Sequence, residues 1–273
     1  MLNPADTESD KHVRSFSSRM SPSDRPARHA TLSFTPRRVA CFFLGLVVMV
    51  VIVGTIANYC IFHVASSPES NGAKVLRRFD LGHEPSIPNM YSSVALLCSA
   101  ALLALIGRLE HRSRQTGWIY WYGLAIVFIG LGIDEAVLFH EMIDAAIKNF
   151  IDTSGFLYLP WVVVGGIFAL VFAIIFIPFV ARKSKRTLWL FILAGAVFIS
   201  GAIGMEIVAS VIFENSGSEE LGKQTISHTI AQSIEELCEM LGIVLFIYAL
   251  IDYLAARFAT IEIRFSPVET RES

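Results

Sequence analysis

The apolar positions of this chain fall in long blocks, not in the short periodic stripes of a soluble protein. Five blocks contain no Lys, Arg, Asp or Glu, at residues 39–63, 88–107, 117–133, 153–181 and 187–205. A sixth, at residues 229–251, is apolar apart from three glutamates. A helix rises about 1.5 Å per residue, so roughly 20 residues cross a hydrocarbon core of about 30 Å. Because backbone groups in lipid must pair within their own segment, the blocks predict an all-α, polytopic bundle of six transmembrane helices.

The blocks and the polar segments between them define three parts of the chain. We predict spans at about residues 39–63, 88–107, 117–143, 154–181, 187–213 and 229–252, within a membrane domain of residues 39–255. Residues 1–38 are rich in Ser, Arg, Asp and Pro, which predicts a disordered basic tail. Residues 256–273 form a short C-terminal tail. A hydrophobic content of 54% and a mean hydropathy of +0.57 argue against a soluble domain, and no nucleic-acid-binding motif occurs.

The basic residues predict an orientation. Of the 22 Lys and Arg residues, 17 fall in the two tails and in the loops after the second and fourth spans, and five fall in the remaining loops. The positive-inside rule therefore predicts that both termini are cytoplasmic, and an odd number of spans would break this alternation. The expected location is a bacterial inner membrane or an equivalent membrane, with the lipid bilayer as the main partner.

Three of the predicted spans carry acidic residues near one end. The third ends with Asp134, Glu135, His140, Glu141 and Asp144, the fifth carries Glu206, and the sixth carries Glu235, Glu236 and Glu239. Counted from the inner boundary of each span, Asp134, Glu206, Glu235 and Glu239 lie roughly 20–28 Å away. These similar depths predict one cluster of carboxylates near the outer membrane face.

Helical spacing places the acids on narrow faces. On the sixth span, His228, Gln232, Glu235 and Glu239 form one stripe at about 100° per residue. Such a stripe must face the bundle interior or water, because a charge facing lipid costs about 2.5 kcal/mol or more. An alternative places residues 134–144 above the membrane, on a helix that continues into water. On the fifth span, the four-residue spacing of Ala196, Ser200 and Gly204 predicts a packing face.

The carboxylates require compensation, because none of these three spans contains a Lys or Arg. Several acids in one pocket of low dielectric constant must either share protons or hold a cation. Carboxylate oxygens with an imidazole suit a divalent metal ion such as Fe, Mn or Zn. We predict a metal site formed by Asp134, His140, Glu206 and Glu239. Glu141 and Glu235 are the predicted catalytic residues, acting in proton transfer.

Known motifs match the chain only in part. The sequence His140-Glu141-x-x-Asp144 is similar to the zincin motif H-E-x-x-H, with Asp144 in place of the second His. The Glu-x-x-His pairs of di-iron bundles are absent. The Glu-Glu-x-x-x-Arg motif of glutamate-type intramembrane proteases fails at Met240, and no late helix carries the His-x-x-x-His of ceramidase-like hydrolases. No family is assigned from these motifs.

Two functions fit the cluster. The first is a membrane-embedded, metal-dependent hydrolase or oxidoreductase that takes a lipid-like or small substrate from the outer leaflet. The alternative is a cation or proton transporter, or a channel subunit, that uses the same carboxylates. The inner halves of the spans carry no polar residues to continue an ion path, which favours the enzyme. A sensor or assembly subunit with structural acids is the third reading.

Overall fold

The computed structural model describes residues 35–64, 70–83, 85–150 and 158–258. Most of the predicted N-terminal and C-terminal tails lies outside these residues. In the described part every regular element is a helix, and six helices are long and apolar enough to cross a membrane. The predictions of an all-helical fold and of six candidate spans are confirmed.

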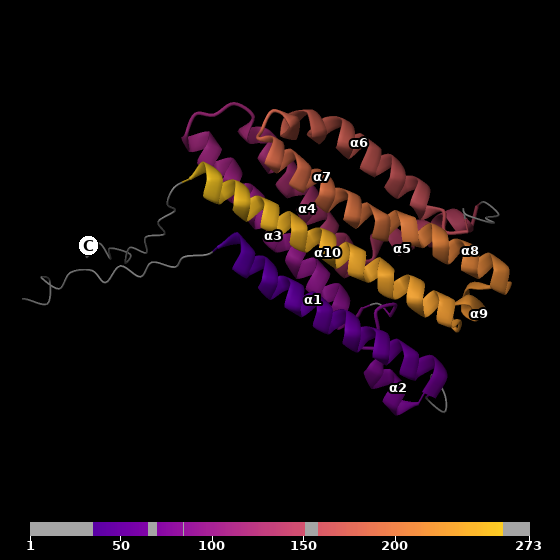
Figure 1. The fold of residues 1–273 in the computed structure, drawn as a ribbon. Coiled ribbons are helices and arrows are strands. Elements are labelled where there is room, and N and C mark those ends of the chain that lie inside the picture. Colours follow the sequence, from indigo (N-terminus) through magenta and orange to yellow (C-terminus); the bar gives the residue numbers. More distant parts are fainter. Residues whose placement is uncertain (1–34, 65–69, 84, 151–157, 259–273) are drawn as a thin grey trace, which may run out of the picture. The chain divides into compact units, whose positions relative to one another are not determined.

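Three short helices follow the first, third and fifth of the six spans (Figure 1). The first span is α1 (Pro36–Tyr59) with a π-helical turn, η2 (Cys60–Val64), and the next three are α3 (Ile87–Arg112), α4 (Trp118–Val137) and α6 (Trp161–Ala181). The fifth consists of α7 (Lys185–Ile199), the π-helix η4 (Ser200–Met205) and α8 (Glu206–Ser216), and the sixth is α10 (Ile226–Arg257). The short helices are α2 (Asn71–Leu76), α5 (Phe139–Lys148) and α9 (Glu219–Lys223).

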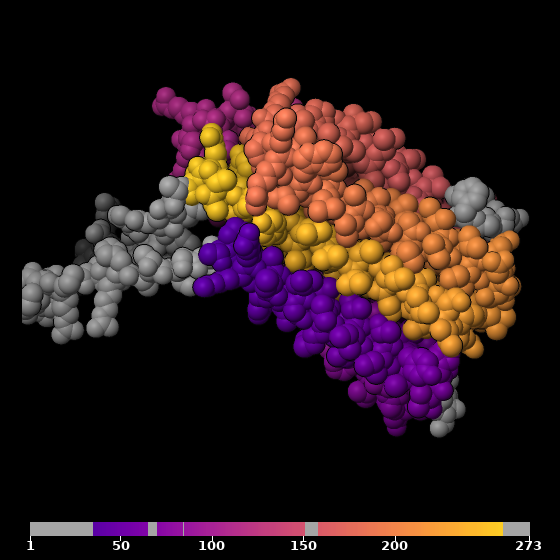
Figure 2. Space-filling model, viewed as in Figure 1, coloured from indigo at the N-terminus to yellow at the C-terminus, as the bar shows by residue number. Residues whose placement is uncertain are grey.

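Helix α10 is the centre of the bundle. It contacts α1, α3, α7, η4 and α8. In its most apolar stretch 56% of the residues are buried, compared with 50% in α3 and 11–22% in the other four spans. Figure 2 shows α10 between α1 on one side and α7 to α8 on the other. Gly242 of α10 allows close packing, because a Cβ there would lie 2.7 Å from Cβ of Phe198 on α7. Helix α6 lies at the edge of the bundle, beside α7 (Figure 1).

Consecutive spans run in opposite directions, which gives the bundle two chemically different ends. We call the end where α1, α4 and α7 begin the basic end, and the opposite end the acidic end. The basic end holds ten of the described Lys and Arg residues: Arg37, Arg38, Arg108, Arg112, Arg114, Arg182, Lys183, Lys185, Arg186 and Arg257. The acidic end holds the other five: Lys74, Arg77, Arg78, Lys148 and Lys223.

A buried carboxylate joins three segments at the basic end. Glu110 of α3 is 1% exposed and accepts a 2.7 Å hydrogen bond from the Tyr253 hydroxyl of α10. Arg257 Nε lies 3.4 Å from Glu110 Oε1, and Lys183 Nζ lies 3.8 Å from Glu110 Oε2. The Lys183 ammonium also lies 5.0–5.8 Å from the ring centroids of Trp121, Phe179 and Tyr253. Burial lowers the pKa of Lys183, and the charge of Glu110 opposes this shift only in part.

The third span is shorter than the predicted 117–143. Helix α4 ends at Val137 because Leu138 adopts a left-handed conformation (φ 65°, ψ 43°), and α5 starts in a new direction at Phe139. The Leu138 amide donates to the Asp134 carbonyl oxygen, and the Asp134 carboxylate accepts from the His140 amide at 3.1 Å. The Asp134 side chain thus caps the first turn of α5.

The packing face predicted on the fifth span is wrong. Ala196 and Ser200 are exposed, and a Cβ on Gly204 would meet no atom within 4 Å. The close contact with α10 is made at Gly201 instead, where a Cβ would lie 2.7 Å from the Glu235 carbonyl oxygen and 2.9 Å from Glu239 Cγ. Gly201 shares a helix face with Ala194, which is buried in the core, and with Phe198, which lies against Gly242, so the span packs on a different face from the predicted one.

Candidate functional site

One cavity of about 900 Å³ lies among α4, α5, α6, α10 and the fifth span. All six predicted site residues line it: Asp134, His140, Glu141, Glu206, Glu235 and Glu239. These residues come from the consecutive helices α4 and α5 and from the later helices α8 and α10. The antiparallel arrangement of the spans brings them to one place, at the acidic end.

The cavity changes character along its length. Towards the acidic end its lining includes nine carboxylates, two lysines and two histidines: Asp134, Glu135, Glu141, Asp144, Glu206, Glu219, Glu235, Glu236, Glu239, Lys148, Lys223, His140 and His228. Towards the basic end it is lined by apolar side chains such as Phe128, Phe176, Leu188 and Phe191. A polar chamber therefore continues into an apolar one.

The apolar part opens through the side of the bundle. Phe168 and Ile177 of α6 and Ile192 and Ile199 of α7 all line the cavity, yet each side chain is 37–49% exposed. A side chain that lines a cavity and also reaches the bundle surface marks an opening. This opening lies between two spans, on a surface that faces lipid when the helices cross a membrane.

Asp134 and His140 form a close pair across the corner between α4 and α5. His140 Nδ1 lies 3.0 Å from Asp134 Oδ2, and the His140 amide donates to Asp134 Oδ1. An ionised carboxylate only accepts hydrogen bonds, so in the neutral form of His140 this contact places the ring proton on Nδ1 and leaves the lone pair on Nε2. Carboxylates orient catalytic and metal-binding histidines in this way.

Glu206 is positioned by the π-helix and by α6. It is the first residue of α8, directly after η4, and its Oε1 accepts from the indole N–H of Trp161 at 3.3 Å. The Trp161 ring lies 5.3 Å from the His140 ring, and the Glu206 carboxylate interacts electrostatically with His140. Trp161 therefore connects Glu206 to the Asp134–His140 pair. Single-turn π-helices occur frequently at functional sites.

The remaining acids form a second group on the α10 side of the cavity. Glu239 interacts electrostatically with Glu236, Glu135, Glu235 and Glu206. Glu135 of α4 accepts a 3.3 Å hydrogen bond from the Asn89 amide of α3. The predicted stripe on α10 thus faces the bundle interior, next to acids of α4 and α8.

A chain of ion pairs crosses the acidic end of the cavity. Lys148 Nζ lies 2.8 Å from Asp144 and 3.5 Å from Glu219, and Lys223 Nζ lies 2.7 Å from Glu219. Burial raises the pKa of Glu219, but its hydrogen bonds and charge interactions with Lys223 and Lys148 outweigh burial, so the net pKa is lowered. Burial likewise lowers the pKa of Lys148, but Asp144 and Glu219 outweigh it and the net pKa is raised.

The predicted metal ligands do not form a metal site in this arrangement. Among the described residues, no group of three or more His, Cys, Asp or Glu side chains is placed to hold a metal ion. In the zincin-like segment, Asp144 is paired with Lys148 and accepts from the Trp161 amide at 3.3 Å, and Glu141 is exposed. The structure of the described residues therefore does not support the predicted metal binding.

His228 is a cavity residue that the predicted site did not include. It is 5% exposed, stacks on Phe213 at 5.0 Å, and its Nδ1 is a buried atom with no hydrogen-bond partner in the described residues. The sequence placed it on the stripe with Gln232 and Glu239, and this spacing was the available signal. Lys148 and Trp161 were also missed, because nothing in the local sequence relates them to Glu206 or Glu219.

The fold and the cavity define a class: a multi-pass helical membrane protein with an acidic chamber between its spans. The chain belongs to the family described as domain of unknown function (DUF8692), whose model matches residues 41–253. This range includes every residue of the cavity. No curated protein and no solved structure matches the chain.

Proposed function

We propose that this protein is a membrane-embedded enzyme that acts on an amphiphilic, lipid-like substrate. The observation that carries the proposal is the division of one cavity into a chamber of carboxylates and histidines and an apolar chamber that opens between α6 and α7. An amphiphile has the same division, with a polar headgroup and apolar chains. Its chains fit between Phe168, Phe176 and Phe191, and its headgroup then lies among the acids.

The apolar chamber favours an enzyme over a conduit. A transported ion or proton needs polar partners along its path, because a bare charge in an apolar site is costly. The part of the cavity nearest the basic end is lined by apolar side chains, among them Phe128, Val180 and Leu188. A chamber that is polar at one end only suits binding and reaction at that end better than passage.

The Asp134–His140 pair is the proposed reaction centre. With its proton held on Nδ1 by Asp134, His140 can accept a proton at Nε2 from a water molecule that attacks the headgroup, and return it to the leaving group. Glu206, linked to this pair through Trp161, is the proposed second proton-transfer group, and Glu141 and Glu235 line the same chamber. The proposed reaction class is hydrolysis at the headgroup.

The proposal also includes a divalent Fe, Mn or Zn ion bound in the acidic chamber. It would bind through His140 Nε2, with Asp134 orienting the ring from behind and carboxylates from Glu206 and Glu239 completing the site. These groups line one chamber, and Glu206 interacts electrostatically with both His140 and Glu239. Binding requires α8 and α10 to move their acids closer to α5 than they lie in the structure.

The proposed orientation has both termini in the cytoplasm and the acidic chamber towards the outer face of a bacterial inner membrane or an equivalent membrane. It is supported by the ten Lys and Arg residues of the basic end and the five of the acidic end. The substrate then enters from the outer leaflet, between α6 and α7.

The test incubates the purified full-length chain with a total polar lipid extract and follows substrate loss and product by mass spectrometry. We expect turnover to fall at least about 100-fold in His140→Ala, the usual scale for a lost acid–base group, and to fall in Glu206→Gln. Glu214→Gln, an exposed acid on the same helix, is the matched control. No lipid turnover by the wild type, or equal turnover by all variants, contradicts the enzyme.

Two glycines test whether the apolar chamber holds the substrate. A Cβ on Gly195 or on Gly130 meets no atom within 4 Å, but only Gly195 lines the cavity. Gly195→Leu should therefore reduce turnover, and Gly130→Leu should not.

The metal content of the wild type and of Glu206→Gln tests the proposed metal ion. A near-stoichiometric metal that the variant loses supports the ion. Active protein without metal rejects the ion and leaves the Asp134–His140 chemistry in place.

A further inference from the structure

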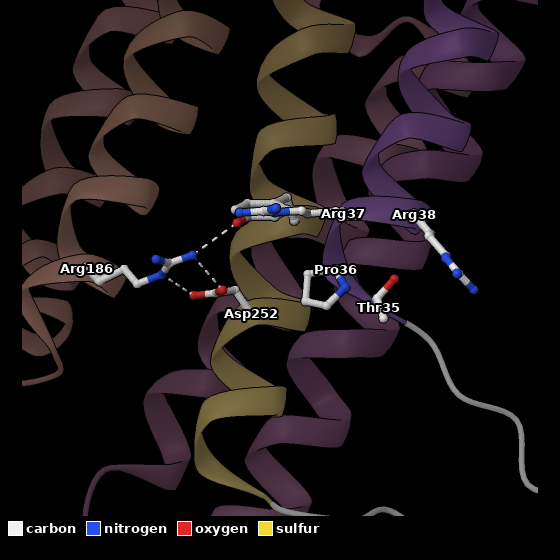
Figure 3. Close-up of a pocket in the computed structure, with 7 residues that line it drawn as sticks. Thr35, Pro36, Arg37, Arg38, Arg186 and Asp252 are labelled. Atoms are coloured by element: carbon white, nitrogen blue, oxygen red, sulfur yellow. Dashed lines mark hydrogen bonds and ion pairs between the residues drawn. The ribbon is translucent and has the colours of Figure 1, made fainter.

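A second pocket, of about 490 Å³, lies at the basic end, where α1 begins beside α7 and α10 (Figure 3). Its lining carries three guanidinium groups and one carboxylate: Thr35, Pro36, Arg37, Arg38, Arg186, Tyr248 and Asp252. The net formal charge of this lining is therefore positive. The pocket is far from the acidic chamber and has no part in the chemistry proposed there.

Arg186 is held in a fixed position on one wall. Its Nε donates to Asp252 Oδ2 at 2.8 Å and its Nη2 donates to Asp252 Oδ1 at 2.9 Å (Figure 3). Nη2 also donates to the Tyr248 hydroxyl at 3.0 Å. The two-point contact neutralises Asp252 and orients the guanidinium plane. Because the Tyr248 oxygen is an acceptor in this contact, its own O–H can donate to a ligand.

The start of α1 supplies the uncompensated charge. Arg37 and Arg38 are exposed and form no ion pair with any other described residue. Figure 3 shows Arg38 on the far side of the first turn from Arg186, so Arg37 is the residue of the pair on which the test rests. The Thr35 side chain makes no capping hydrogen bond, and the first backbone N–H groups of a helix have no partner within it.

We propose that this pocket binds a phosphate group, supplied by the headgroup of an anionic phospholipid in the leaflet at the basic end. Guanidinium groups match the geometry of phosphate oxygens, and basic pockets between transmembrane helices bind anionic headgroups. The lipid source is favoured by α1 itself, whose apolar side chains Leu44 and Val48 lie seven and eleven residues after Arg37, on the same helix face, and are 41% and 46% exposed. Acyl chains of a lipid bound at Arg37 and Arg186 would cover this surface.

The test titrates the full-length chain, in zwitterionic detergent, with short-chain phosphatidylglycerol, short-chain phosphatidylcholine and inorganic phosphate, and follows the rise in Tm. We expect phosphatidylglycerol to raise Tm at concentrations where phosphatidylcholine does not. In Arg37→Gln its apparent Kd should rise about tenfold, which corresponds to about 1.4 kcal/mol. Arg112→Gln removes another exposed charge from the same end, outside the pocket, and should bind as the wild type does.

Each outcome bears on the pocket. Equal weakening by Arg37→Gln and Arg112→Gln would show general surface attraction and overturn the proposal, as would equal effects of the two lipids. Inorganic phosphate that matches phosphatidylglycerol in the wild type, and is lost in Arg37→Gln, would keep the phosphate site and assign it to the free anion.

Discussion

Glu110 is a charged residue that stabilises the bundle from inside. Because it ends an apolar run next to Arg108 and Arg112, its sequence context is that of a loop at the membrane surface. The structure buries it against Tyr253, with Lys183 and Arg257 close to its two oxygens. A buried carboxylate is tolerated when its hydrogen-bonding capacity is met and a cation lies near, as here. Its role is to join α3, α10 and the α6–α7 connection.

Substituting Tyr253 or Glu110 should destabilise the protein, and the loss should be larger for Glu110. Tyr253→Phe deletes one hydrogen bond to a charged group and should lower the free energy of unfolding by about 1–2 kcal/mol. Glu110→Ala also leaves Lys183 without its partner and should cost about 3 kcal/mol. Thermal unfolding in mild detergent measures both, with the exposed Glu214→Ala as control. Unchanged Tm values in both variants would show that the network contributes nothing to stability.

The individual acids could be predicted, whereas their partners could not. Depth and helical spacing were enough to select Glu206, Glu235 and Glu239, because those rules act within one helix. The hydrogen bond from Trp161 to Glu206 joins residues 45 positions apart on different helices. Such contacts depend on how the spans pack, and one sequence carries no direct record of that packing.

Among the helices, the blocks of apolar residues predicted the six spans well, but the sequence did not indicate two local irregularities, the end of α4 at Leu138 and the π-helix before Glu206. The sequence around Leu138 contains no Gly or Pro, so nothing in it indicates that α4 ends there in a left-handed residue. The Asp134 contacts with the Leu138 and His140 backbone stabilise this corner after the chain has folded. The π-helix before Glu206 was likewise hidden, because Ala196, Ser200 and Gly204 have the four-residue spacing of an ordinary α-helical packing face.

The ion pairs that join α5 and α9 predict a pH dependence. Since the pKa of Glu219 is lowered from its ordinary 4.5, its stabilising contribution is complete above that value and is lost as pH falls through the lowered pKa. Lys148, whose pKa is raised, contributes below its ordinary pKa and loses this contribution only as pH rises through the raised value. Both groups therefore contribute fully at pH 7.

Glu219→Gln should consequently lower Tm at pH 7 and make less difference as the medium becomes acidic. The expected loss is about 0.5 kcal/mol, because these pairs reach water and are partly screened. Tm values of the wild type and the variant between pH 3 and 7 measure it, with the exposed neighbour Glu220→Gln as control. A gap between Glu219→Gln and the wild type that is constant over this range would contradict the assigned titration.

At the scale of the whole molecule, the two ends of the bundle are as different as its two chambers. Basic residues gather at one end together with the phosphate pocket, and the acidic chamber lies at the other. The same asymmetry that predicts the orientation therefore also predicts the membrane face from which a substrate reaches the Asp134–His140 pair.

Accessibility of single cysteines tests this orientation, in a background in which the native cysteines are replaced by alanine: Cys41, Cys60, Cys98 and Cys238. Glu220→Cys reports the acidic end and Arg114→Cys the basic end, and both positions are exposed. A membrane-impermeant maleimide should label Glu220→Cys on intact cells, and Arg114→Cys only after the membrane is opened, because basic loops remain on the cytoplasmic side. The opposite pattern would place the acidic chamber in the inner leaflet and the phosphate pocket in the outer one. The substrate and the anionic lipid would then have to come from the exchanged leaflets, although the two pockets would be unchanged.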